Sequence, residues 1–127
     1  MRSMNRKWLA GVACLVLVSC QAAPPKGDWK GFTRHFVERY FELNPDYAVY
    51  QGDHRFDGQL PDWSAAGLKA RKDFLHQAIA DAEGYKNLAK ADAFERDYLV
   101  DVAKADLFWL EDADQPHTDP AFYAGSL

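Results

Sequence analysis

Apolar side chains recur at helical intervals in three long stretches of the chain, and no stretch alternates convincingly as a half-buried β-strand would. The aromatic residues of the first stretch follow one another at steps of three and four: Trp29, Phe32, Phe36 and Tyr40. Asp28 fits the N-cap, and Asn44 precedes a proline, where the α conformation is disfavoured. This stretch therefore predicts a helix from Asp28 to about Leu43.

A short helix is predicted directly afterwards, because Pro45 suits a first helical turn and Gly52 suits a helix end. Residues 52–63 have no helical period, and we expect a structured loop there. Ser64 is the expected N-cap of a second long helix, which runs to about Glu83. Its predicted inner face consists of Leu68, Leu75, Ile79 and Ala82, with Phe74 at the edge.

The third stretch predicts a helix from about Asp92 to about Asp112, because Asp92 and Glu95 have the spacing of a capping box. Its apolar residues form a seam that we expect to be core: Phe94, Tyr98, Val102, Ala105 and Trp109, flanked by Leu99 and Leu107. The residues after 114 are turn-like and include two prolines. The pattern as a whole predicts an all-α fold with three substantial helices and one short helix.

The N-terminal residues have the organisation of an export signal. Three basic residues, Arg2, Arg6 and Lys7, precede an apolar run over residues 8–18, which is too short to cross a bilayer as a helix of about 20 residues. The sequence that ends at Cys20, Leu-Val-Ser-Cys, resembles the bacterial lipobox, which implies cleavage before Cys20 and acylation of that residue. The alternative is an ordinary signal peptide cleaved near Ala22 or Ala23.

We therefore divide the chain into a lipoprotein signal peptide (residues 1–19), an acylated tether (20–27) and a helical segment (28–127). Two or three acyl chains would anchor the protein stably, since each buried CH₂ contributes about 0.8 kcal/mol. Gln21 stands where enteric lipoproteins retained in the inner membrane usually have an aspartate. The expected location is therefore the cell envelope, at the outer membrane and facing the periplasm.

Composition excludes several classes of protein. Hydrophobic residues make up 48% of the chain and aromatic residues 14%, which is too apolar for a disordered protein. The formal net charge is −4, and no basic stripe is present, so a nucleic-acid partner is not expected. Both cysteines, Cys14 and Cys20, lie near the N-terminus, so the body of the chain has neither disulfides nor Cys-based zinc sites.

The densest polar cluster lies in the loop from Gly52 to Gly58. Asp53, His54 and Asp57 could supply up to three ligands to a transition metal. If the loop is instead aligned with an EF-hand, Arg55 falls on a ligand position, which argues against calcium binding. We favour a structural loop whose aspartates cap turns and pair with Arg55. The chain contains no HExxH, GxSxG, Walker A or GxGxxG motif, so no catalytic residue is assigned.

Three segments together resemble the N-terminal part of the bacterial family called Domain of Unknown Function 885 (DUF 885). They are residues 47–57 (YAVYQGDHRFD), residues 60–64 (LPDWS) and residues 94–99 (FERDYL), within a similarity over about residues 30–123. Many members are predicted lipoproteins, and they are typically longer and largely helical. Their C-terminal portion carries an HExxH-type zinc motif, so the resemblance implies metallopeptidases of the gluzincin type.

No position of this chain matches the zinc ligands or the general base of that motif. We therefore expect an incomplete helical domain, the N-terminal fragment of an envelope lipoprotein whose missing C-terminal portion would carry the zinc and the catalytic residues. For the Gly52–Asp57 loop, the resemblance implies only a structural role or a place at the rim of a cleft. Two alternatives remain open at this point: a free-standing small helical lipoprotein with a binding or scaffolding role, and a small metal-binding module that uses Asp53, His54 and Asp57.

Overall fold

The computed structural model of the chain describes residues 27–124, and these residues form helices and loops without a β-strand. The predicted all-α class is therefore confirmed for this part of the chain. The predicted signal peptide, Cys20 and most of the tether lie outside the described residues. None of the helices between residues 27 and 124 combines the length and the hydrophobicity that a membrane-spanning segment needs.

The first two helices begin and end where local sequence signals predict. Helix α1 (Trp29–Leu43) is capped by Asp28, whose carboxylate accepts a hydrogen bond from the backbone N–H of Gly31 at 2.8 Å. Helix α2 (Pro45–Tyr50) has its proline in the first turn and is followed by Gly52 at φ 90°. Because a residue with a Cβ rarely adopts this conformation, Gly52 suits the point at which the chain turns into the loop.

The loop contains a single 3₁₀ turn, η1 (His54–Phe56), and leads to the longest helix, α3 (Ala65–Gly84). The side chain of Ser64 caps α3 by accepting from the backbone N–H of Gly67 at 3.1 Å. A Cβ on Gly67 would lie 2.1 Å from the carbonyl oxygen of Asp62, so only glycine fits here. The chain before α3 therefore lies directly against its first turn.

Helix α4 (Lys90–Leu107) continues into a π-helical turn, η2 (Phe108–Asp112), in which the Ala113 N–H donates to the Phe108 carbonyl at 2.8 Å. The predicted capping box is wrong. The N-cap is Ala89, which has no side chain that can accept a hydrogen bond, and Asp92 lies inside the first turn. Two single-turn helices follow, α5 (Gln115–Thr118) and α6 (Ala121–Ala124), in the region predicted to be turn-like.

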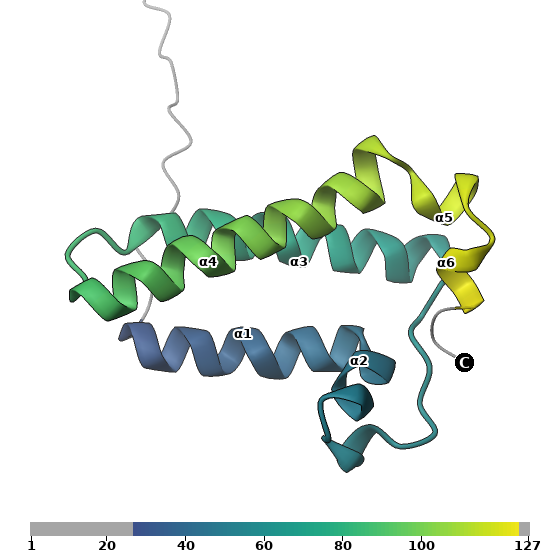
Figure 1. The fold of residues 1–127 in the computed structure, drawn as a ribbon, viewed down its shortest axis with the longest axis horizontal. Helices are drawn as coiled ribbons and strands as arrows, with labels where there is room; N and C mark the ends of the chain where they lie inside the picture. Colours follow the sequence, from purple (N-terminus) through teal and green to yellow (C-terminus); the bar gives the residue numbers. More distant parts are fainter. Residues whose placement is uncertain (1–26, 125–127) are drawn as a thin grey trace, which may run out of the picture.

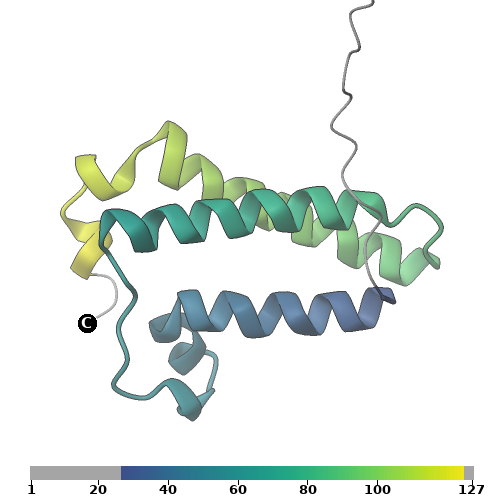
Figure 2. The same ribbon diagram turned by 180° about the vertical axis from the view of Figure 1, so that it is seen from behind.

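Helices α3 and α4 form an antiparallel hairpin, and α1 lies beside it, antiparallel to α3 and parallel to α4 (Figures 1 and 2). The α3–α4 contact is by far the most extensive between two helices, and its larger buried cluster consists of Leu68, Leu75, Ala103, Leu107 and Leu110. The predicted inner face of α3 is confirmed, with Ile79 partly buried and Phe74 at the edge. A smaller cluster around Trp29 and Ala82 joins α1 to the hairpin.

The predicted core face of α4 is wrong. The side chains that pack against α3 and α1 are Val100, Ala103, Leu107 and Leu110, together with the partly buried Leu99. The predicted seam faces outward instead: Phe94 is 74% exposed, Tyr98 66% and Trp109 49%. Small and aliphatic residues allow α4 to approach α3 closely, and among residues 27–124 this leaves the bulkier aromatic side of α4 largely exposed.

Candidate functional site

An apolar groove with a volume of about 450 Å³ lies between α1 and α4. Its α1–α2 wall consists of Thr33, Phe36, Val37, Tyr40, Phe41, Tyr47 and Gln51. Its α4 wall consists of Phe94, Glu95, Tyr98, Leu99 and Val102. Most of these side chains are apolar or aromatic, which is the usual lining of a site that binds an apolar group.

The groove exists because α1 and α4 both pack on α3 and have few contacts with each other. Phe94 and Tyr98 stand on its outer edge on one side, and Val37, which is 45% exposed, stands on the other. A single exposed apolar residue is ordinary, whereas a contiguous apolar surface that is hollowed along its length commonly marks a contact site. The groove is therefore the best candidate for a functional surface in the described part of the chain.

Two side-chain hydrogen bonds join the helices on either side of the groove. The indole Nε1 of Trp29 donates to Glu95 Oε2 at 3.2 Å, and the hydroxyl of Tyr40 donates to Asp106 Oδ2 at 2.8 Å. Burial, followed by the nearby Asp106 carboxylate, raises the pKa of Tyr40 well above its ordinary value. Tyr40 is therefore a neutral hydrogen-bond donor at physiological pH, which favours a positioning role over a catalytic one.

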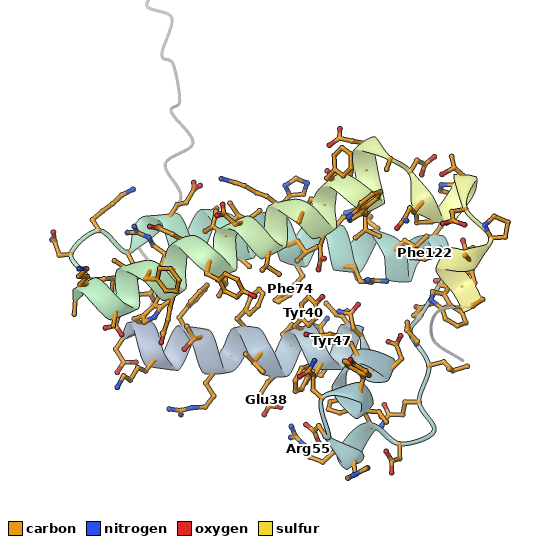
Figure 3. The ribbon with its side chains drawn as sticks, in the orientation of Figure 1. Glu38, Tyr40, Tyr47, Arg55, Phe74 and Phe122 are labelled. Atoms are coloured by element: carbon orange, nitrogen blue, oxygen red, sulfur yellow. The ribbon has the colours of Figure 1, made fainter. Side chains whose placement is uncertain are left out.

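The polar loop lies next to one end of the groove and is fastened to α1. Figure 3 shows Glu38 of α1 and Arg55 of the loop pointing toward each other, and Arg55 Nη2 lies 3.1 Å from Glu38 Oε1. Phe56 is buried and makes an edge-on contact with Phe41, with 6.4 Å between ring centroids. The loop is thus held by one ion pair and one aromatic contact, close to Gln51 at the end of the groove.

The three candidate metal ligands of this loop have other partners. Arg55 Nε donates to Asp53 Oδ1 at 2.9 Å, and this hydrogen bond is the main cause of the lowered pKa of Asp53. His54 Nδ1 lies 3.2 Å from the carboxylate of Asp57. Between residues 27 and 124, no three His, Cys, Asp or Glu side chains are grouped so that they could hold a metal ion.

The sequence reasoning missed the groove as a site, although it identified most of the apolar residues that line it. Helical periodicity groups residues by face, and it assigned the most aromatic face of α4 to the core. The useful signal was the second apolar face of the same helix, formed by Val100, Ala103, Leu107 and Leu110. A helix with two apolar faces has more apolar surface than one neighbouring helix can cover.

Comparison of the chain with protein-family models, with curated proteins and with solved structures gives no match in any of the three. The resemblance to DUF 885 stays a prediction. The support for a function therefore comes from the geometry of the groove and from the sequence signals described above.

Proposed function

We propose that this chain is the N-terminal helical segment of a lipid-anchored bacterial envelope protein, and that its α1–α4 groove holds an amphipathic helix from a further part of that protein. The observation that carries the proposal is the exposed aromatic side of α4, above all Phe94 and Tyr98. Covering these rings with an apolar partner would remove a large apolar surface from water, at about 25 cal/mol per Å².

The arrangement of the helices suits a helical occupant. Helices α1 and α4 run in the same direction and α3 runs in the opposite direction (Figures 1 and 2), and the groove between α1 and α4 opens along one side of the three helices. A helix is about 10–12 Å across with its side chains, and a fourth helix along this side would complete a four-helix bundle. Such an occupant would run antiparallel to both helices that border it, as neighbours in most simple bundles do.

The charges beside the groove define the chemistry of that helix. On α1, the exposed Lys30 and Arg34 lie one to two turns before Val37 and on the same side of the helix. On α4, the acidic residue that lines the groove is Glu95, whose carboxylate accepts a hydrogen bond from the Trp29 indole. The occupant should therefore be apolar on the face that enters the groove and carry acidic residues along the side that meets Lys30 and Arg34 of α1.

The resemblance to DUF 885 supplies a source for this helix. In that family the longer C-terminal portion would carry the zinc motif, and this segment would form part of the wall of the cleft. The zinc and the catalytic residues would then belong to the partner portion, and we assign neither to this chain. The role proposed for this chain is to position that portion at the membrane through the acylated Cys20.

Photo-crosslinking in cells tests the groove. The photoreactive residue p-benzoylphenylalanine would replace Tyr98 at the groove, and in a matched control it would replace Tyr50, which is 83% exposed and absent from the groove lining. We expect a product from position 98 only, and mass spectrometry should place it on an amphipathic helix of the same gene product. Attachment to a separately encoded protein would instead favour a free-standing lipoprotein with a binding role, and attachment at both positions alike would contradict a specific groove.

Partition between detergent and water tests the anchor separately. Cys20→Ala should move the protein from the detergent phase into the aqueous phase, whereas Cys14→Ala should leave it in the detergent phase. Persistence of the Cys20→Ala variant in the detergent phase would contradict acylation at Cys20 and would leave the groove proposal untouched.

A further inference from the structure

A second cavity, of about 200 Å³, lies near the C-terminal end of α1, and its chemistry differs from that of the groove. Its wall includes one cation and one acid, Arg71 of α3 and Asp46 of α2. Its aromatic residues include Tyr47, Trp63 and Phe122. They come from α2, from the loop before α3 and from α6, so the cavity is formed by segments far apart in the sequence.

Arg71 is the unusual member of this wall. Within residues 27–124 its guanidinium makes neither a side-chain hydrogen bond nor an ion pair, although it is only partly exposed. Three other arginines pair with nearby carboxylates: Arg39 with Glu42, Arg55 with Asp53 and Arg96 with Asp97. The contact of Arg71 with the cavity wall is a cation–π contact, its Cζ lying 5.9 Å from the centre of the Phe122 ring.

A partly buried guanidinium with unused donors is costly, because it has lost water without gaining a partner. Desolvation by burial accordingly lowers the pKa of Arg71 below its ordinary value. The cation stays charged, since arginine does not lose its proton in proteins. Its planar N–H groups match the two oxygens of a carboxylate, which makes a carboxylate the natural partner for this position.

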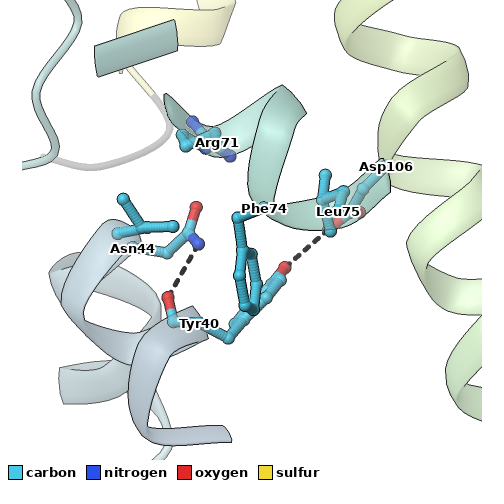
Figure 4. A pocket seen from close by; sticks show the side chains of 7 residues that line it. Tyr40, Asn44, Arg71, Phe74, Leu75 and Asp106 are labelled. Atoms are coloured by element: carbon cyan, nitrogen blue, oxygen red, sulfur yellow. Dashed lines mark hydrogen bonds between the residues drawn. The ribbon is translucent and has the colours of Figure 1, made fainter. Parts of the chain in front are cut away.

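The neighbouring polar groups are already engaged or are negatively charged. Figure 4 shows a neighbouring pocket that shares Tyr40, Asn44 and Arg71 with this cavity. In it the Asn44 side-chain amide donates to the Tyr40 carbonyl oxygen at 2.8 Å, and the Tyr40 hydroxyl donates to Asp106. Asp46 and Asp106 both lie close enough to raise the pKa of Arg71 in opposition to the larger effect of burial, but neither forms an ion pair with it. A simple anion at Arg71 would therefore sit near two carboxylates, and a simple cation at Asp46 would sit near a guanidinium.

We propose that this cavity binds a small zwitterion of the α-amino-acid type with an apolar side chain. The carboxylate of the ligand accepts hydrogen bonds from Arg71, and its ammonium group faces Asp46. Its side chain lies against Trp63 and Phe122. A volume of about 200 Å³ is below the 300–1,000 Å³ typical of sites for drug-sized ligands, and this limits the ligand to about the size of a single amino acid.

The site is distinct from the α1–α4 groove in its charged residues and in its ligand. Tyr40 and Tyr47 are the residues that line both. The proposed helical occupant of the groove and the proposed zwitterion can therefore fail independently. Cross-linking at position 98 reports on the groove, whereas titration with a small molecule reports on the cavity at Arg71.

Isothermal titration calorimetry of the full chain with three probes of similar shape tests the proposal. L-Leucine carries both charges, 4-methylpentanoate carries only the carboxylate, and 3-methylbutylamine carries only the ammonium group. We expect saturable binding of L-leucine, and binding of the other two weaker by about tenfold or more, which is the effect of losing one charge-assisted hydrogen bond. Absence of saturable L-leucine binding up to about 10 mM would overturn the proposal.

Two variants assign the charged partners. Arg71→Lys keeps the charge but removes the planar donor pair, and Asp46→Asn removes the acid at similar size, so each should weaken L-leucine binding about tenfold. Arg39→Lys, at an exposed arginine that pairs with Glu42, is the matched control and should bind as the parent does. Thermal melts check that each variant is folded. Unchanged L-leucine binding in a folded Arg71→Lys or Asp46→Asn variant, or equally tight binding of 4-methylpentanoate, would rule out the zwitterion.

Discussion

The hydroxyl of Tyr40 donates a hydrogen bond to the carboxylate of Asp106 at 2.8 Å, across a separation of 66 residues in the chain. Tyr40 belongs to α1 and Asp106 to the last turn of α4, two helices that otherwise have few contacts. The carbonyl oxygen of Tyr40 also accepts from both the backbone and the side-chain amide of Asn44. Tyr40 thus fixes the C-terminal end of α1 and joins α1 to α4.

Tyr40→Phe should lower the free energy of unfolding by about 1–2 kcal/mol. The ring would remain, but the partly buried Asp106 carboxylate would lose its donor, and an acceptor left without a partner costs about this much. Urea denaturation followed by circular dichroism measures the change. The matched control is Tyr50→Phe, which removes a hydroxyl from a ring that is 83% exposed and should change stability by less than about 0.5 kcal/mol. Equal losses in the two variants would contradict the importance of this hydrogen bond.

Stability should fall at alkaline pH in a way that depends on Tyr40. Its pKa is raised in the folded state, first by burial and then by Asp106, whereas in the unfolded chain it is near 10. The contribution of Tyr40 is therefore complete below about pH 10 and is lost as the pH rises further, because the unfolded tyrosine gives up its proton first. The slope for one such group approaches about 1.4 kcal/mol per pH unit.

The free energy of unfolding at about pH 9 and about pH 11 tests this slope. Tyr40→Phe should make the decrease shallower, whereas Tyr50→Phe should leave it as in the parent chain. Burial also raises the pKa of Tyr85, which contributes in the same direction and is present in both variants. The same pH dependence in the parent and in Tyr40→Phe would contradict the prediction.

Leu75→Ala should destabilise the protein by about 2–5 kcal/mol, the range found when a buried leucine is truncated. Leu75 is 3% exposed and lies in the buried cluster between α3 and α4. The matched control is Leu60→Ala, at a leucine that is 57% exposed in the loop, where the change should be below about 0.5 kcal/mol. Chemical denaturation measures the free energy of unfolding of both variants. Similar losses in the two would contradict the placement of Leu75 in the core.

Ala89→Ser should stabilise the protein by about 0.5–1 kcal/mol. Ala89 occupies the N-cap of α4 with an extended backbone, φ −60° and ψ 157°, and provides no side-chain acceptor for the first turn. A serine hydroxyl there could accept from a free backbone N–H, as Ser64 does at the start of α3. Ala91→Ser, two residues further and inside the helix, is the control and should be slightly destabilising because serine is a weaker helix former. A melting temperature that falls in both variants would contradict this cap assignment.

The starts of α1 and α3 could be predicted because their signals are local. Asp28 and Ser64 each cap the helix that follows, and the proline after Asn44 separates α1 from α2. Each signal depends on backbone geometry over three or four residues, which a short sequence determines. The start of α4 could not be predicted in this way, because alanine at an N-cap leaves no polar signal and Asp92 suggested a start that is too late.

The orientation of α4 and the site could not be predicted, because they depend on the choice between two apolar faces. The helical periodicity of the sequence is equally consistent with a core that contains Phe94 and Tyr98. The face with Val100 and Ala103 allows closer packing on α3, and this competition is decided by shape in three dimensions. The cavity at Arg71 could not be predicted either, because it forms only in the tertiary structure: Asp46, Arg71 and Phe122 come from three separate segments.

The sparse contact between α1 and the α3–α4 hairpin gives the molecule two levels of stability. The amides of α1 and α2 should exchange with deuterium through a partial opening that leaves the hairpin intact, and the amides at the centre of α3 and α4 should exchange only on global unfolding. Such a detached α1 would carry Trp29 out of its buried position, so the opening would also quench or shift its fluorescence. The groove side of the three helices is therefore the side from which unfolding begins, and a helix bound in the groove would slow the exchange of α1 most.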